Sequence, residues 1–103
     1  MPNAVFLNSY KLKKGASVPD FLLAVDRLWN EHISKQKGFI SSKLLVDNET
    51  WTDFTIFESM DDLNAFLALS EKTGGTNDLA ENFYSFLNLN SCKSHLFSVE
   101  KSY

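Results

Sequence analysis

The residue in this sequence best placed to do chemistry is Asn8, which lies between Phe6 and Tyr10 in an alternating segment. Alternation places these three side chains on one face of a strand. A buried amide needs partners for its donors and its acceptor. Asn8 is therefore either a structural hydrogen-bonding group or a catalytic group that orients a substrate oxygen and stabilises a developing oxyanion.

The second candidate catalytic residue is His32, which follows the apolar positions Leu28 and Trp29 of a predicted helix. There it would serve as a general base beside a pocket between helix and sheet. The alternative is a partly solvated histidine favoured by the helix dipole. His95, in the last predicted strand, is interpreted as structural. Two distant histidines without a carboxylate at ligand spacing form no metal motif, so no metal is expected.

Aromatic side chains make up 14% of the chain, including nine Phe. Such rings would line a pocket for a flat apolar ligand, although helical spacing also predicts their burial in a core without any ligand. The candidate pocket residues are Tyr10, Trp29, Phe66, Phe83 and Tyr84. The single cysteine, Cys92, has no identifiable base beside it and no disulfide partner, so we expect an inert thiol in a cytoplasmic protein.

These side chains must be positioned by a first strand and a first helix. Alternating residues predict a strand over 4–12. The sequence Ser17-Val18-Pro19-Asp20 resembles a capping box with proline in the first turn, which predicts a helix start. Apolar residues spaced by three, four and seven continue that helix, and Lys37-Gly38 is typical of its C-terminus.

The rest of the chain alternates between strand and helix signals. We predict strands over 39–46 and 51–58, joined by a turn of about four residues. Ser59-Met60-Asp61-Asp62 predicts the start of a second helix, which residues 73–76 end. A further helical segment over 77–89 and a last strand over 91–101 complete the chain.

The resulting β-α-β-β-α-β order predicts an α+β, ferredoxin-like fold: an antiparallel sheet with its helices on one face, in a single domain over residues 1–103. The opposite sheet face would then expose Val5, Leu7, Phe54 and Ile56. Monomers rarely tolerate a bare apolar patch of that size, so we expect a homodimer packed through the sheet.

Charge and hydropathy exclude two classes of partner. The net charge is −3, which argues against nucleic acid and anionic membrane surfaces. No apolar run reaches the roughly 18 residues of a membrane span. We therefore expect neither a nucleic-acid partner nor a membrane partner.

Three motifs in order resemble those of the antibiotic biosynthesis monooxygenase family. They are the segment 10–15 leading into a helix, Lys37-Gly38-Phe39 leading into a strand, and the segment 57–61 leading into the second helix. The resemblance covers nearly the whole chain and implies a dimeric α/β barrel. Members include cofactor-independent oxygenases acting on aromatic polyketides, haem-degrading monooxygenases and proteins without a known reaction.

The haem-degrading branch matches this sequence at only one of its three known positions. Asn8 stands where that branch has its first-strand Asn, but Phe66 replaces its Trp, and Thr76 or Asn77 replaces its haem-binding His. Neither side chain can replace the imidazole ligand of haem iron. Haem degradation is therefore not expected, and no cofactor is predicted.

Two functions remain open, with haem binding without turnover as a third, weaker variant. The first is a cofactor-independent monooxygenase acting on an aromatic or polycyclic substrate in a pocket between helices and sheet, with Asn8 and His32 as its polar groups. The second is a non-catalytic homodimer that binds a small apolar ligand or a partner, which explains the aromatic content equally well.

Overall fold

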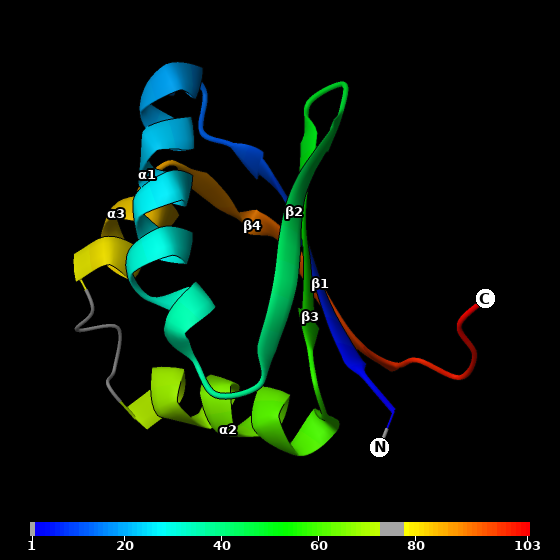
Figure 1. The fold of residues 1–103 in the computed structure, drawn as a ribbon. Coiled ribbons are helices and arrows are strands. Elements are labelled where there is room, and N and C mark those ends of the chain that lie inside the picture. The colour runs from blue at the N-terminus through cyan, green and yellow to red at the C-terminus, as the bar shows by residue number, and fades with distance from the viewer. Residues whose placement is uncertain (1, 73–77) are drawn as a thin grey trace.

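Four antiparallel strands form one sheet in the order β2-β3-β1-β4, and the helices cover one face of it (Figure 1). The computed structural model describes residues 2–72 and 78–103. In chain order the elements are β1 (Ala4–Leu12), α1 (Val18–Glu31), a short 3₁₀ helix η1 (Ile33–Lys35), β2 (Phe39–Asp47), β3 (Thr50–Phe57), α2 (Met60–Lys72), α3 (Asp78–Tyr84) and β4 (Leu87–Ser98). The predicted α+β, ferredoxin-like fold is confirmed.

Serine hydroxyls start the two long helices, as their sequences predict. Ser17 caps α1, its Oγ accepting a hydrogen bond from the Asp20 N–H at 3.3 Å, with proline in the first turn. Ser59 Oγ accepts from the Asp62 N–H at 3.1 Å at the start of α2. Each hydroxyl satisfies a backbone donor that the first helical turn leaves free.

The predicted end of the first helix at Lys37-Gly38 is wrong. α1 ends at Glu31, because His32 leaves helical backbone geometry at φ −132°. The Gln36 amide donates to the His32 carbonyl at 3.1 Å, which satisfies an acceptor that the helix end leaves free. Gly38, at φ +85°, provides the left-handed turn into β2.

The hairpin between β2 and β3 is tighter than predicted. Asp47 pairs with Thr50, so two residues form the loop rather than four. Asn48 occupies the left-handed region at φ +55°, which asparagine tolerates better than most residues.

The predicted helix over 77–89 and strand over 91–101 have wrong boundaries. α3 ends at Tyr84 and β4 spans Leu87–Ser98, because β1 continues to Leu12 and pairs there with Leu87. The predicted end of the second helix at 73–76 and the start at Asn77 lie outside the described residues.

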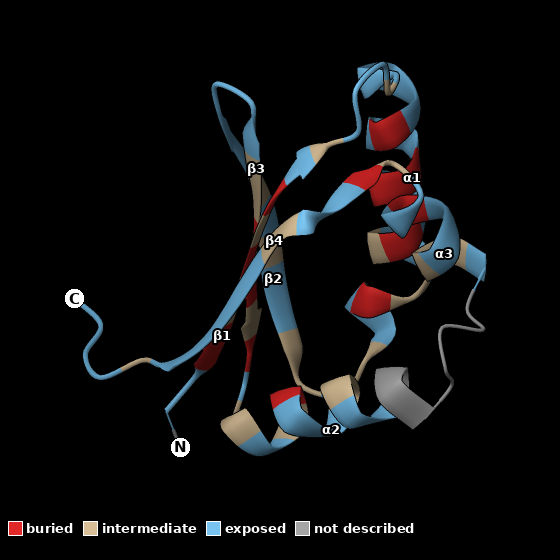
Figure 2. Cartoon of the chain, turned by 180° about the vertical axis from the view of Figure 1, so that it is seen from behind, coloured by how far each residue is buried: buried red, intermediate tan, exposed pale blue. Residues whose placement is uncertain are grey.

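The core lies between the helices and the covered sheet face, in two clusters. Figure 2 shows buried residues along the side of α1 that faces the sheet. The larger cluster, between α1, α3 and the sheet, contains Tyr10, Phe21, Val25, Leu28, Ile33, Phe83 and Leu87. The smaller one, under α2, contains Ala4, Phe57 and Leu63.

No helix in the described part of the chain covers the other face of the sheet (Figure 1). The strand register places Val5, Leu7, Phe54 and Ile56 there, as the sequence predicts. The same register adds two side chains that are each 47% exposed, Leu45 and Phe97. Val5 is nevertheless buried, and Leu7, Phe54 and Ile56 are of intermediate exposure. We refer to these six residues as the bare face, because no described helix covers them.

Candidate functional site

A row of three polar residues crosses the middle of the covered sheet face. Asn8 on β1 pairs with Asp53 on β3 and with Ser94 on β4, so the three side chains lie side by side. Asn8 is 7% exposed and Asp53 is 3% exposed. The Ser94 hydroxyl donates to Asn8 Oδ1 at 3.0 Å. Strand pairing therefore holds this row in register beneath the helices.

Tyr10, two residues after Asn8 on the same strand face, completes the arrangement. Its buried hydroxyl donates to Asp53 Oδ1 at 2.7 Å. The Tyr10 ring is fixed edge-on between Phe21 and Phe83, at centroid distances of 6.1 and 5.7 Å. The core therefore holds this hydroxyl in place on one oxygen of the carboxyl.

Burial raises the pKa of Asp53 to about 7. Hydrogen bonds from Tyr10 and from the Asn8 amide oppose the shift by stabilising the charged form. Burial and the neighbouring carboxyl raise the pKa of Tyr10 far above its ordinary value. Asp53 can therefore gain or lose a proton near neutral pH, whereas Tyr10 remains a neutral hydrogen-bond donor.

The Asp53 carboxyl borders a cavity of about 200 Å³ between α1 and strands β2 and β3. Its lining residues are Val25, Asp26, Trp29, Asn30, Ser42, Lys43, Leu44 and Asp53. Trp29 contributes an indole ring whose Nε1–H is buried and has no hydrogen-bond partner among the described residues. Asp53 and Trp29 thus line the same small space, while the Trp29 Nε1–H is itself buried and does not open onto it.

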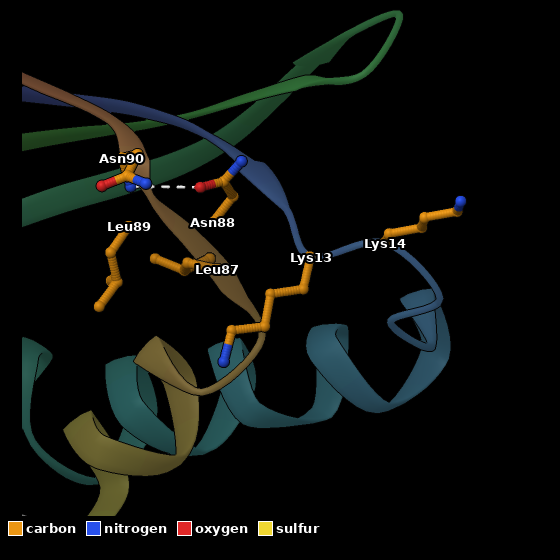
Figure 3. A pocket seen from close by; sticks show the side chains of 6 residues that line it. All are labelled: Lys13, Lys14, Leu87, Asn88, Leu89 and Asn90. Atoms are coloured by element: carbon orange, nitrogen blue, oxygen red, sulfur yellow. Dashed lines mark hydrogen bonds between the residues drawn. The ribbon is translucent and has the colours of Figure 1, made fainter.

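A second hollow, of about 340 Å³, lies where β4 begins, and Figure 3 shows its lining residues: Lys13, Lys14, Leu87, Asn88, Leu89 and Asn90. All of them except Leu87 are exposed. The Asn88 side chain accepts a hydrogen bond from the Asn90 N–H at 3.2 Å, so it serves the local backbone. No buried titratable group borders this hollow, and we assign the candidate site to the smaller cavity.

The structure brings three of the predicted site residues to the Asp53 site. Asn8 lies beneath the helices, Tyr10 donates to the carboxyl, and Trp29 borders the cavity. Phe83 lies behind them in the core, with its ring centroid 5.5 Å from that of Trp29.

The other predicted site residues lie apart from the Asp53 cavity. His32 is at the C-terminal end of α1, its ring 6.3 Å from that of Phe66, and neither borders the cavity. Phe66 stacks on Phe57 at 5.5 Å. Tyr84 is 48% exposed at the end of α3. Thr76 and Asn77, which bear on the haem comparison, lie outside the described residues.

Sequence reasoning missed Asp53, although a signal for it exists. Aspartate is depleted in strands, yet this one shares a strand face with Trp51 and Phe57. A carboxyl on an apolar strand face indicates either an edge position or a buried functional group. Only the β1–β3 register, which sets Asp53 opposite Asn8, distinguishes the two.

Among the described residues, no group of three or more His, Cys, Asp or Glu lies close enough together to hold a metal ion. None of the helices in that part of the chain is long and apolar enough to cross a membrane.

Solved structures give the comparison that decides the fold. The cofactor-independent oxygenase SnoaB from Streptomyces nogalater superposes with a TM-score of 0.76 at 15% identity, covering 99% of this chain and 97% of that one. A putative antibiotic biosynthesis monooxygenase from Bordetella bronchiseptica gives 0.73 at 12% identity, covering 94% and 96%. This chain has the fold of the antibiotic biosynthesis monooxygenases.

A third structure with this monooxygenase fold contains a ligand. It is the monooxygenase encoded by ActVA-Orf6 of Streptomyces coelicolor, in complex with nanaomycin D. It gives a TM-score of 0.66 at 9% identity, covering 99% of this chain and 91% of that one. No family model matches the sequence, and no curated protein matches it significantly.

Proposed function

We propose that this protein is a cofactor-independent monooxygenase that oxidises a small phenolic substrate in the cavity between α1 and the sheet. The observation that carries the proposal is the Asp53 carboxyl, buried, held by Tyr10 and bordering the cavity. The monooxygenase fold supports the reaction class, since SnoaB is such an oxygenase.

In the proposed reaction, Asp53 accepts the proton of the substrate hydroxyl. The resulting phenolate is electron-rich and transfers electrons to dioxygen. One oxygen atom then forms a new carbonyl on the ring and the other leaves as water, so that a phenol and O₂ give a quinone and H₂O. All the electrons come from the substrate, and a general base with a pKa near the working pH is the group this chemistry needs.

The size of the cavity limits the substrate. Pockets for drug-sized ligands usually measure about 300–1,000 Å³, whereas this one measures about 200 Å³. We therefore propose a substrate of one or two rings, at the small end of the aromatic and polycyclic compounds that the family resemblance implies. The Trp29 indole forms one wall of that space.

Oxygen uptake with α-naphthol tests the proposed function. We expect the wild-type protein to consume O₂ and, with ¹⁸O₂, to place one labelled atom in the quinone. The rate should rise with pH through about 7, as Asp53 loses its proton. Asp53→Asn should lower the rate by roughly 100-fold or more, because it removes the base. Asp47→Asn, at the exposed end of the hairpin, is the matched control.

Retention of the rate in Asp53→Asn would contradict the proposal. If the wild-type protein binds α-naphthol without consuming oxygen, the alternative of a non-catalytic ligand-binding protein gains the support that the oxygenase loses. Asn8→Leu, which removes the amide acting on Asp53, should reduce the rate less than Asp53→Asn, because Tyr10 still holds the carboxyl.

We also propose that two copies associate through the bare face. The half-exposed Leu45 and Phe97 lie on the side that the helices leave open, on the same sheet face as Leu7, Phe54 and Ile56. A stable interface of this kind buries at least about 1,200 Å² in total. We further propose a cytoplasmic location, since Cys92 is a free thiol.

A further inference from the structure

The polar row on the covered sheet face runs from the protein surface to the buried carboxyl. Ser94 lies on β4, an edge strand of the sheet, and is exposed, whereas Asn8 and Asp53 on the two inner strands are buried. The Ser94 hydroxyl donates to Asn8 Oδ1 at 3.0 Å. At the other end of the row, the Asn8 amide stabilises the charged form of Asp53. A side chain at the sheet edge is therefore connected to the proposed base through one amide.

The Asn8 amide serves the carboxylate in only one of its two orientations. The amide carries its N–H donors on one side and its acceptor oxygen on the other. With Nδ2 towards Asp53 it donates to the carboxylate, and after a half-turn its oxygen would face the carboxylate and repel it. The hydrogen bond from Ser94 satisfies Oδ1 in the first orientation. A donor on the amide oxygen also polarises the amide, which makes its N–H a stronger donor.

We propose that Ser94 is a positioning residue for the proposed base: its hydroxyl orients and polarises the Asn8 amide, and the amide holds the Asp53 carboxyl ready to accept a proton. Ser94 does not border the cavity, so it acts on the reaction only through Asn8. Strand pairing keeps the three side chains in line, since Asn8 pairs with both Asp53 and Ser94. The role of Ser94 in the reaction rests on the proposed function, whereas its effect on Asp53 does not.

Several other groups act on Asp53, and a change at Ser94 removes none of them. The titratable groups that interact with Asp53 or border its cavity are Tyr10, Asp26, Lys43, Tyr84 and Cys92. Burial raises the pKa of Tyr10, Tyr84 and Cys92 above their ordinary values, so these three stay protonated near neutral pH. A change in the titration of Asp53 on substitution of Ser94 therefore reports the hydrogen-bonded row.

Ser94→Val and Ser94→Thr form a matched pair of variants. Both introduce a β-branched side chain, which suits a strand. The threonine hydroxyl can still donate to Asn8, whereas valine has a methyl group in its place. That methyl group also keeps a water molecule from replacing the lost donor. An effect that the two variants share reports side-chain size, and a difference between them reports the hydroxyl.

The first measurement follows the titration of Asp53 without any substrate. Carbon-13 NMR of the carboxyl groups gives the titration midpoint, with the Asp53 signal identified by its loss in Asp53→Asn. The midpoint in Ser94→Val should lie above that in Ser94→Thr by about 0.5 in pH or more, because the charged form loses support. In an Asn8→Leu background the same two substitutions should give equal midpoints, since the hydroxyl then has no amide to act on.

The second measurement is oxygen uptake with α-naphthol as a function of pH. The rise in rate should be displaced to higher pH in Ser94→Val relative to Ser94→Thr, by the same amount as the NMR midpoint. A wild-type protein that consumes no oxygen, while the two variants differ by NMR, supports the positioning of Asp53 and contradicts the oxygenase. Equal NMR midpoints in the two variants, or a difference that persists in the Asn8→Leu background, would overturn the proposal.

Discussion

At the scale of single residues, the charged form of Asp53 destabilises the fold because its carboxyl is buried. The same burial raises the pKa of Asp53 to about 7, the range that a general base needs. Its carboxyl is 3% exposed, and burial of a charge is costly unless hydrogen bonds compensate it. Tyr10 and Asn8 supply part of that compensation. A residue that costs stability at neutral pH and is nevertheless held in place by two partners is typical of a functional site.

The pH dependence of stability tests this cost directly. The pKa of Asp53 is about 7 in the folded protein against 3.8 for the ordinary value. Below about pH 4 the carboxyl is protonated in both states. Between pH 4 and 7 the unfolded chain loses this proton first, so the wild-type protein loses stability as pH rises, by up to about 4 kcal/mol in total.

Asp53→Asn should remove this pH-dependent loss while keeping a side chain of similar shape. The melting temperature of the variant minus that of the wild type should increase from pH 4 to pH 8, as measured by circular dichroism. The groups that interact electrostatically with Asp53 are Tyr10, Tyr84 and Cys92, and the pKa of each is raised above its ordinary value, so they stay protonated over this pH range in both proteins. A difference that stays constant with pH would mean that Asp53 is ionised without penalty.

The sequence identifies part of this site and misses the rest for a physical reason. Asn8 is recognisable because a polar residue within an alternating apolar strand indicates burial. Asp53 lies 45 positions away, and its burial beside Asn8 depends on the register between β1 and β3. Register follows from the whole sheet, which a local pattern cannot show. The position of Trp29 beside the cavity likewise depends on how α1 packs.

At the scale of elements, helix starts are easier to predict than strand and helix ends. Ser17 and Ser59 carry their capping chemistry in the local sequence, and both predicted starts are correct. The start of β4 at Leu87 depends instead on pairing with the end of β1, a contact between residues far apart in the chain. Local signals therefore predict it too late.

Two glycines provide a controlled test of the loops that position the site. Gly15 and Gly38 both have φ above +80°, so alanine is strained at either position. A Cβ at Gly38 would also lie 2.7 Å from the Asp62 Cβ, whereas a Cβ at Gly15 would meet open space. Gly38→Ala should therefore lower the melting temperature by several degrees more than Gly15→Ala. Equal losses would show that α2 moves aside without cost.

At the scale of the whole molecule, the bare face should decide the oligomeric state. Light scattering should give about twice the chain mass of 11.7 kDa for the wild-type protein at micromolar concentration. Phe97→Asp or Leu45→Asp should shift the mass to that of one chain, because each places a charge at the apolar interface. Leu23→Asp is the matched control, since Leu23 is 61% exposed on α1 and away from the sheet.

A single-chain mass for the wild-type protein would contradict the dimer. A dimer that survives both sheet substitutions and dissociates with Leu23→Asp would instead place the interface on the helix side of the molecule.

The two sides of the cavity have different capacities for evolutionary change. The polar row of Asn8, Asp53 and Ser94 is fixed by backbone pairing across three strands. The facing wall is formed by α1 side chains, including Val25 and Trp29, which can be exchanged without altering that pairing. Substitutions on α1 can therefore enlarge, narrow or reshape the space while the Asp53 carboxyl keeps its position. Under the proposed function, a lineage with this architecture acquires new substrates by altering one helix face and retains the proposed base in the sheet.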